Sequence, residues 1–185
     1  MARLRHNRAL FARALHPDQA RPLPTMPAIH IRTFRPGDEP ALRALFHAAV
    51  HGLAHKEYTP EQLAAWAPQD YDTVQWARRM QANQPFIAQA PDTGAVAGFA
   101  DLQASGYIDQ FFVAPAFAGQ GVARALMSHI HAQAAQRGIA QLHADVSLTA
   151  EPFFAACGFV VQARQQAERQ GVVLHNARMV KVLIM

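Results

Sequence analysis

Residues 107–125 read YIDQFFVAPAFAGQGVARA and decide the fold of this chain. The apolar run at residues 107–113 predicts a strand, and a short loop broken by Pro115 follows it. The loop then passes through Gly119 and Gly121 directly into a helix rich in Ala, Leu and Arg. The first turn of a helix has unpaired backbone N–H groups and the positive end of the helix dipole. We therefore expect this loop to bind an anionic group such as a pyrophosphate.

The composition is that of one soluble globular domain. The chain has 185 residues, of which 51% are hydrophobic and 16% charged, which excludes a disordered protein. No run approaches the roughly 18 apolar residues that a membrane-spanning helix needs, so no membrane partner is expected. Cys157 is the single cysteine, which excludes an internal disulfide and fits a reducing cytoplasm.

The net charge of +4 is concentrated at the N-terminus. Residues 1–25 hold five arginines and one aspartate, so the remaining chain is formally neutral. We therefore expect no nucleic-acid partner for the folded part. The pattern predicts a flexible basic extension at residues 1–27 and one domain at residues 28–185.

The elements after this extension follow in close order. A first strand precedes three helical runs, the second of which starts at the capping-box sequence Thr59-Pro60-Glu61-Gln62. Two strands joined by a turn, the strand at 107–113 and the glycine loop come next. A long helix, a strand at 142–146, a short helix and a C-terminal hairpin complete the chain. This order indicates an α/β protein.

The order of elements and the glycine loop resemble the GNAT superfamily of acyl-CoA-dependent N-acetyltransferases. In that family the loop reads Arg or Gln, two variable residues, Gly, one variable residue, then Gly or Ala. The corresponding residues here are Ala118-Gly119-Gln120-Gly121-Val122-Ala123. Gly121 and Ala123 match, whereas Ala118 departs from the pattern, and Gln120 or Arg124 is a candidate for a replacement side-chain donor.

This resemblance implies a particular fold and co-substrate. We expect a central, mixed and mostly antiparallel twisted sheet of about seven strands flanked by helices. The sheet should be splayed between its fourth strand (107–113) and its fifth (142–146). Acetyl-CoA is the implied co-substrate, with its binding residues in the fourth strand, the loop and the short C-terminal helix: Phe111, Phe112, Val113, Ala118, Gly119, Gln120, Gly121, Val122, Ala123, Arg124, Ser147 and Phe154.

The short helix that ends at Gly158-Phe159 matches the family but lacks one functional group. Many members have a tyrosine four residues before this glycine, as the acid that reprotonates the departing thiolate. Here the residue is Phe154, whose ring cannot donate a proton. The acid is therefore absent or supplied elsewhere.

Residues 55–67 resemble a bacterial subgroup of GNAT proteins of the YafP type. The family places its acceptor-binding helices in this region, so His55, Tyr58 and Trp66 are candidate acceptor-binding residues. His143 and Asp145 alternate with apolar residues on the fifth strand. They are candidates for acceptor contact, or they form the polar side of a half-covered strand.

Asp109 is the candidate catalytic base, acting directly or through water. Strand alternation places its side chain on the same face as Tyr107, Phe111 and Val113. Partial burial in the cleft is expected to raise its pKa toward a value useful for a base. Alternatively, Asp109 anchors a neighbouring loop or the ammonium group of the acceptor.

The spacing of His47, His51 and His55 would align three imidazoles on one helix, but Gly52 interrupts the run and no carboxylate stands at ligand spacing. We therefore expect no metal site.

The sequence thus predicts direct acetyl transfer from acetyl-CoA to a primary amine of a small molecule or peptide. The alternative is a non-catalytic acyl-CoA-binding or sensing module, which the phenylalanine at position 154 favours. The C-terminal hairpin is the surface at which a homodimer would form.

Overall fold

The computed structural model of the chain describes residues 29–183. The predicted basic extension lies outside the described residues, so the domain boundary near residue 28 stays a prediction. The elements in chain order are β1 (His30–Thr33), α1 (Glu39–Leu53), α2 (Pro60–Trp66), α3 (Thr73–Asn83), β2 (Phe86–Gln89), β3 (Val96–Ala100), β4 (Tyr107–Ile108), β5 (Phe111–Val113), the 3₁₀ turn η1 (Pro115–Phe117), α4 (Val122–Gln136), β6 (Gln141–Ser147), α5 (Glu151–Ala156), β7 (Val160–Arg169) and β8 (Val172–Val182).

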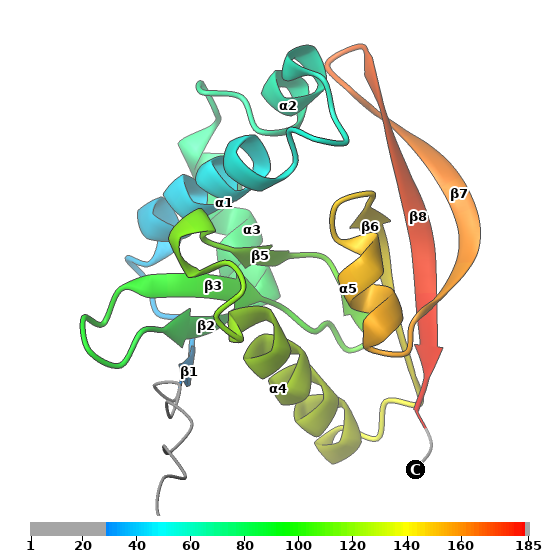
Figure 1. Cartoon of the computed structure of the whole chain (residues 1–185). Helices are drawn as coiled ribbons and strands as arrows, with labels where there is room; N and C mark the ends of the chain where they lie inside the picture. Colours follow the sequence, from blue (N-terminus) through cyan, green and yellow to red (C-terminus); the bar gives the residue numbers. More distant parts are fainter. Residues whose placement is uncertain (1–28, 184–185) are drawn as a thin grey trace, which may run out of the picture.

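The strands form two four-stranded sheets. The first has the order β1-β2-β3-β5 and is antiparallel throughout, and the second has the order β4-β6-β8-β7. Figure 1 shows the first sheet on the left and the long strands of the second on the right. The predicted mixed, mostly antiparallel α/β fold flanked by helices is confirmed.

The predicted fourth strand is in fact two strands. Tyr107 and Ile108 (β4) pair with β6 in parallel, whereas residues 111–113 (β5) pair with β3. Asp109 and Gln110 lie between the two pairings and belong to neither strand. The expected splay is therefore a break in the fourth strand, with one half in each sheet.

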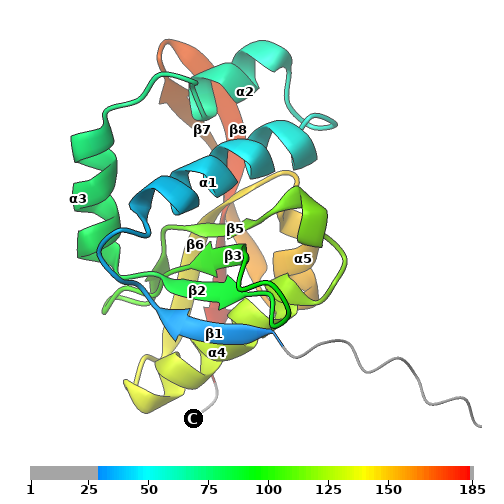
Figure 2. The ribbon, with the colours of Figure 1, turned by 90° about the vertical axis from the view of Figure 1, so that its left-hand side faces the viewer.

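The first sheet is covered on both faces. Phe86 and Ala88 of β2 pack in the core that contains Leu126 and Ile130 of α4. Ile87, between them, packs in a separate core with α1 and α3. Successive side chains of a strand point to opposite faces, so α4 covers one face and α1 and α3 the other. Figure 2 shows α1 and α4 on opposite sides of β1–β3.

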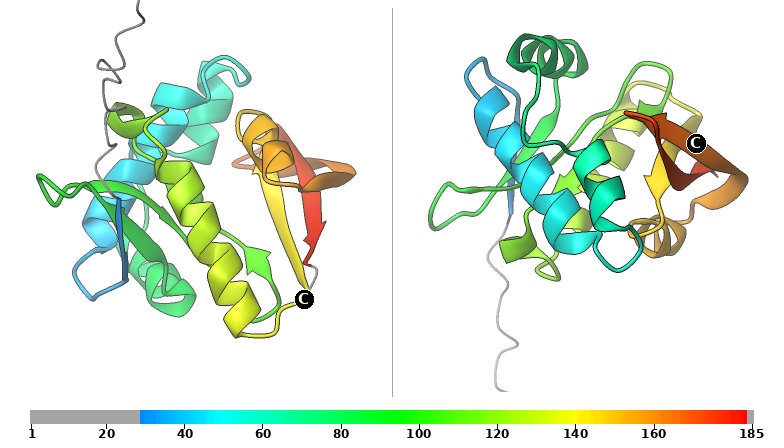
Figure 3. Two further views of the ribbon diagram at one scale, coloured as in Figure 1. Left: turned by 60° about the horizontal axis from the view of Figure 1, so that its bottom comes forward. Right: turned by 90° about the horizontal axis from the view of Figure 1, so that it is seen from above.

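The helix α2 connects the two halves of the molecule. Its predicted capping box is confirmed: Gln62 N–H donates to the Thr59 hydroxyl at 3.3 Å, and Thr59 N–H donates to Gln62 Oε1 at 2.9 Å. Gln62 Nε2 also donates to the Val173 carbonyl of β8 at 2.8 Å. Figure 3, seen from above, shows α2 between α1 and the strands β7 and β8.

The hairpin of β7 and β8 has several exposed valines: Val160, Val161, Val173 and Val182. The predicted homodimer at this hairpin stays a prediction. No helix within residues 29–183 has the length and apolar character needed to cross a bilayer.

Candidate active site

The break in the fourth strand is stabilised by a buried carboxylate. Asp101 follows β3 and is completely buried. Its Oδ1 accepts hydrogen bonds from the backbone N–H groups of Asp109 at 2.7 Å and Gln110 at 3.2 Å, and its Oδ2 accepts one from Asn83 Nδ2 at 2.6 Å. Burial raises the pKa of Asp101 to about 6, although these hydrogen bonds oppose the rise. The Asp101 carboxylate thus replaces the strand carbonyls that would otherwise accept from the N–H groups of Asp109 and Gln110.

A narrow apolar slot of about 220 Å³ opens where β5 and β6 part. Its walls include Phe111 and Val113 on one side, Ala144 and Val146 of β6 on the other, and Phe154 of α5. The slot reaches from Ala123 in the first turn of α4 to Asp109 and Ser147. An extended apolar chain anchored at the start of α4 would therefore end beside Asp109.

The free edge of β5 faces this slot. The backbone groups of Gln110 and Ala114 point toward β3. The Gln110 carbonyl accepts a hydrogen bond from the Asp101 N–H, and the Ala114 N–H donates to the Ala97 carbonyl. Backbone groups alternate in direction along a strand. The N–H and C=O groups of Phe111 and Val113 therefore point away from β3, whereas those of Phe112 point toward it.

The glycine loop has the free N–H groups that an anion site requires. Gly119 and Gly121 have φ angles of 75° and 83°, in the left-handed region that favours glycine. Within residues 29–183, the backbone N–H groups of five residues have no hydrogen-bond acceptor: Gly119, Gly121, Val122, Ala123 and Arg124. The predicted cradle therefore has the expected donors.

Two other parts of the loop are already engaged. The N–H of Ala118 donates to the Pro115 carbonyl at 3.2 Å, and that of Gln120 donates to the Phe117 carbonyl at 3.3 Å. The side-chain amide of Gln120 donates one hydrogen bond to the Ala116 carbonyl at 2.8 Å, which leaves its second N–H for a ligand. Arg124 is exposed and is the other candidate for a side-chain donor.

A second, larger cavity of about 840 Å³ lies between α1, α2, α3 and the second sheet. The two cavities share five lining residues: Trp66, Asp109, Phe112, Asp145 and Ser147. At this junction a group in the slot would meet a group in the larger cavity. The predicted residues Asp109, Phe112, Ser147, Asp145 and Trp66 are thus brought together.

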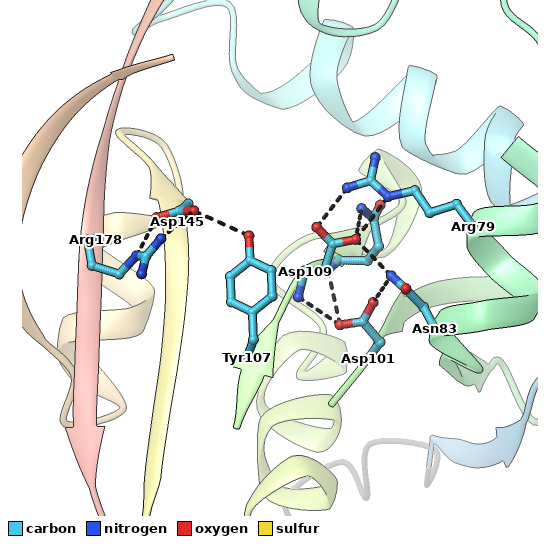
Figure 4. Close-up of polar contacts among 8 residues, drawn as sticks. Arg79, Asn83, Asp101, Tyr107, Asp109, Asp145 and Arg178 are labelled. Carbon is cyan, nitrogen blue, oxygen red and sulfur yellow. Dashed lines mark hydrogen bonds and ion pairs between the residues drawn. The ribbon is translucent and has the colours of Figure 1, made fainter. Parts of the chain in front are cut away.

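Asp109 is held by several partners at the junction (Figure 4). Arg79 binds both carboxylate oxygens, with Nε 2.9 Å from Oδ2 and Nη2 2.7 Å from Oδ1. Asn83 Nδ2 and Gln110 Nε2 also donate to Oδ2, at 2.7 Å and 3.2 Å. Burial alone would raise the pKa of Asp109, but Arg79 and these hydrogen bonds hold it below the usual value. The expectation of a raised pKa was therefore wrong, because nothing in the sequence indicated that Arg79 would contact Asp109.

Tyr107 and Asp145 form the opposite wall of the junction. Arg178 binds both oxygens of Asp145, at 2.6 Å and 3.0 Å, and the Tyr107 hydroxyl donates to Asp145 Oδ2 at 3.3 Å. Burial and the neighbouring carboxylates of Asp145 and Asp109 raise the pKa of Tyr107 to about 12. Tyr107 is therefore a neutral phenol. It is hydrogen-bonded to Asp145 and is also close enough to Asp109 to feel its charge.

The break at Gln110 also changes which side chains share a face. Tyr107 and Asp109 line the larger cavity, whereas Phe111 and Val113 line only the slot. Asp109 lines the slot together with Phe111 and Val113, so of the four residues expected on one face only Tyr107 departs.

The remaining predicted residues divide into two groups. Tyr58 lines the larger cavity, but its hydroxyl is engaged with the Leu148 N–H and the His175 carbonyl. His55 is exposed, its Nδ1 lies 3.1 Å from the Gly52 carbonyl, and it lines neither cavity. His143 also lines neither cavity and stacks on Tyr107 with 5.2 Å between ring centroids.

The sequence did not indicate four residues of the site: Arg43, Arg79, Asp101 and Gln110. An acid directly after the apolar run of β3 was a usable signal for Asp101. Arg43 shares α1 with Glu39, and Arg79 shares α3 with Arg78. Neither spacing marks one of these residues as part of the site. Over residues 29–183, no group of three or more His, Cys, Asp or Glu side chains is arranged to bind a metal ion.

Comparison with known proteins agrees with this geometry. A family model for the acetyltransferase (GNAT) domain matches residues 54–181. The uncharacterized N-acetyltransferase YafP of Escherichia coli (strain K12) is 33% identical over 150 residues, covering 80% of this chain and 92% of YafP.

Solved structures show the same likeness. The GCN5-related N-acetyltransferase "Aminotransferase, Class-II" from Rhodopseudomonas palustris has a TM-score of 0.81 and 32% identity, with 85% of this chain and 98% of that chain covered. The PaiA N-acetyltransferase from Thermoplasma acidophilum in complex with coenzyme A has a TM-score of 0.64 and 16% identity, over 84% of this chain and 99% of that chain.

The chain therefore belongs to the GNAT acetyltransferase family. It is an acyl-CoA-dependent N-acyltransferase, which confirms the predicted enzyme class. The alternative of a non-catalytic acyl-CoA-binding module is correspondingly disfavoured.

Proposed function

We propose that this enzyme transfers the acetyl group of acetyl-CoA directly to a primary amine of a small molecule or peptide. The observation that carries this proposal is the junction of the two cavities. Five residues line both cavities beside the break in the fourth strand. A thioester at the end of the slot and an amine in the larger cavity would be adjacent there, which removes much of the entropic cost of their encounter.

In this proposal, acetyl-CoA is bound mainly by backbone groups. The pyrophosphate accepts hydrogen bonds from the free N–H groups of the glycine loop and the first turn of α4. The pantetheine arm lies along β5, where the outward-facing backbone groups of Phe111 and Val113 bind its amides as a neighbouring strand would. A backbone N–H of this edge polarises the thioester carbonyl as negative charge develops on its oxygen.

Asp109 acts in its ionised form. Its lowered pKa makes it a weak base at neutral pH. We infer that Asp109 holds the acceptor amine, directly or through water, in line with the thioester. The amine proton then leaves through water, and the neutral nitrogen attacks the carbonyl carbon.

The departing thiolate needs a hydrogen-bond donor that Phe154 does not provide. The Ser147 hydroxyl lines both cavities and accepts a hydrogen bond from the Ala150 N–H at 3.2 Å. The Ser147 hydroxyl donates to no acceptor within residues 29–183. We infer that Ser147 donates its hydroxyl proton as a hydrogen bond to the sulfur as negative charge develops on it.

The test is a thiol-release assay with purified protein, acetyl-CoA and a panel of primary amines. The proposal predicts amine-dependent release of CoA, and an absence of release with every amine would contradict it. Asp109→Asn should reduce kcat/KM by at least about tenfold with little change in CoA affinity.

The matched control is Asp38→Asn. Arg32 binds both oxygens of Asp38 at 2.7 Å and 2.8 Å, and the buried fraction of this carboxylate is similar to that of Asp109. Asp38 lines neither cavity. If the two variants lose activity equally, Asp109 contributes only through stability and has no part in the transfer.

A further inference from the structure

The carboxylates that line the larger cavity are already engaged. Asp109 is bound by Arg79, and Asp145 by Arg178. Asp72 caps α3, where its Oδ1 accepts from the N–H groups of Val74 and Gln75 at 2.9 Å each. A cationic group of the acceptor would therefore find each of these three acids neutralised or hydrogen-bonded. The cavity is poorly suited to a second ammonium group.

Arg43 is a cation in the same cavity with no acid beside it. It is 5% exposed, and the ion pairs found within residues 29–183 do not include it. One guanidinium N–H donates to the Pro68 carbonyl, and the guanidinium carbon lies 4.2 Å from the Tyr71 ring centroid. Burial lowers the pKa of Arg43. A buried guanidinium without a counter-ion is costly, so an anion in the cavity would bind favourably.

Two hydrogen-bond acceptors in the same cavity lack donors. Gln110 Oε1 and Asn176 Oδ1 are buried and have no partner among the described residues. Both residues line the larger cavity, and Gln110 is 4% exposed. Because Gln110 Nε2 donates to Asp109, the orientation of this amide is fixed with the oxygen available. Buried acceptors are nearly always hydrogen-bonded, to protein or to ordered water, and the N–H groups of an amine in the cavity are donors that suit them.

The cation and the free acceptors are separated by aromatic rings. The Arg43 guanidinium carbon lies 5.3 Å from the Phe46 ring centroid, and this centroid is 4.8 Å from that of Phe112. Phe112 lines both cavities, whereas Arg43 lines only the larger one. An acceptor that reaches both ends therefore has its anionic group several bonds away from its amine.

We propose that the acceptor is an amine that also has a carboxylate, bound with the carboxylate on Arg43 and the amine at Gln110 and Asp109. This inference rests on the proposed amine acetylation and names the class of acceptor. It excludes polyamines, since their second ammonium group would lie next to Arg43. The aromatic rings of Phe46, Trp66 and Trp76 line the larger cavity and provide apolar surface for the part of the acceptor between the two groups.

The test compares matched acceptors that differ in charge. 4-(Aminomethyl)benzoate has an amine and a carboxylate at opposite ends of a ring, 4-(aminomethyl)benzamide replaces the carboxylate by a neutral amide, and spermidine is the polycation. The wild-type enzyme should prefer the acid to the amide by roughly 10- to 100-fold in kcat/KM, the range for a charge-assisted hydrogen bond. Spermidine should be the poorest acceptor.

Arg43→Gln should lower kcat/KM for the acid much more than for the amide, so that the preference approaches unity. Arg164→Gln is the matched control, because Arg164 forms an exposed pair with Glu151 and lines neither cavity. It also removes one positive charge, and the preference should persist. Calorimetric titration of acid and amide into the CoA-saturated protein gives a second readout that requires no turnover.

The outcomes separate the two proposals. If amines release CoA but the amide or spermidine equals the acid, the carboxylate inference fails and amine acetylation stands. An absence of release with every amine contradicts amine acetylation, and the titration then decides whether Arg43 selects a carboxylate. Equal binding of acid and amide would overturn the inference. Should Arg43→Gln fail to fold, the wild-type preference alone decides.

Discussion

Removal of one hydroxyl group, in Tyr58→Phe, tests how the cavity wall is held in place. Tyr58 is 5% exposed, and its hydroxyl donates to the His175 carbonyl of β8 at 2.6 Å. The same oxygen accepts from the Leu148 N–H, which follows β6, at 3.0 Å. This one group therefore ties the segment before α2 to two parts of the second sheet.

Phenylalanine retains the ring packing but leaves the partly buried His175 carbonyl and Leu148 N–H without this partner. The expected loss is about 1–3 kcal/mol of unfolding free energy, the range for a polar group that loses its partner on removal from water. For a chain of this length the loss corresponds to a decrease in Tm of about 2–12 °C. The KM for the acceptor should rise as well, because Tyr58 lines the larger cavity.

Calorimetry and urea unfolding measure the stability, with Tyr71→Phe as the matched control. Tyr71 is 38% exposed, and no hydrogen bond of its hydroxyl occurs within the described part of the chain. Its replacement should leave the unfolding free energy within about 0.5 kcal/mol of the wild-type value. If both variants have the same Tm, water satisfies Leu148 and His175, and the proposed tie does not exist.

Two further predictions concern the loop and the buried carboxylate. Gly121→Ala places a Cβ on a residue with a φ of 83° and should lower the unfolding free energy by about 1 kcal/mol. Calorimetric titration should also show roughly tenfold weaker CoA binding, because the N–H groups of the first turn of α4 move. The control is Gly138→Ala, at a φ of 65° beyond the other end of α4, which should have the same stability cost with unchanged CoA affinity. Equal losses of CoA affinity in the two variants would contradict pyrophosphate binding by the glycine loop. For Asp101, the pKa is near the ordinary 3.8 in the unfolded chain and about 6 in the folded chain, so its contribution to stability falls as pH rises through this window. Between pH 4 and pH 7, urea unfolding should show the unfolding free energy of the wild type falling by up to about 3 kcal/mol relative to that of Asp101→Asn. If the unfolding free energies of the two proteins change with pH in parallel, the pKa of Asp101 is not raised.

The local features of this chain could be predicted because short-range contacts decide them. The capping box at Thr59 and Gln62 depends on residues three apart, and the left-handed turn at Gly121 depends on a residue without a Cβ. Alternation of Phe86, Ile87 and Ala88 across β2 follows from the pleat of the strand. The order of helices and strands, and with it the family, follows from such local patterns.

The active-site chemistry could not be predicted in the same way, because contacts between distant residues decide it. Asp109 appears in the sequence as an acid on an apolar strand, but Arg79, thirty residues earlier, reverses the direction of its pKa shift. Asp101 breaks the fourth strand by binding two N–H groups that a continuous strand would have paired.

The sequence by itself thus determined most of the elements, the glycine loop before α4 and the family, since each depends on residues close together in the chain. Only the tertiary structure decided that the fourth strand is divided between two sheets, that Asp109 is clamped and ionised, and that Arg43 is a buried cation in the larger cavity. The physical reason is that burial and ion pairing depend on which helix faces meet, and charged side chains spaced along a helix do not specify their partners.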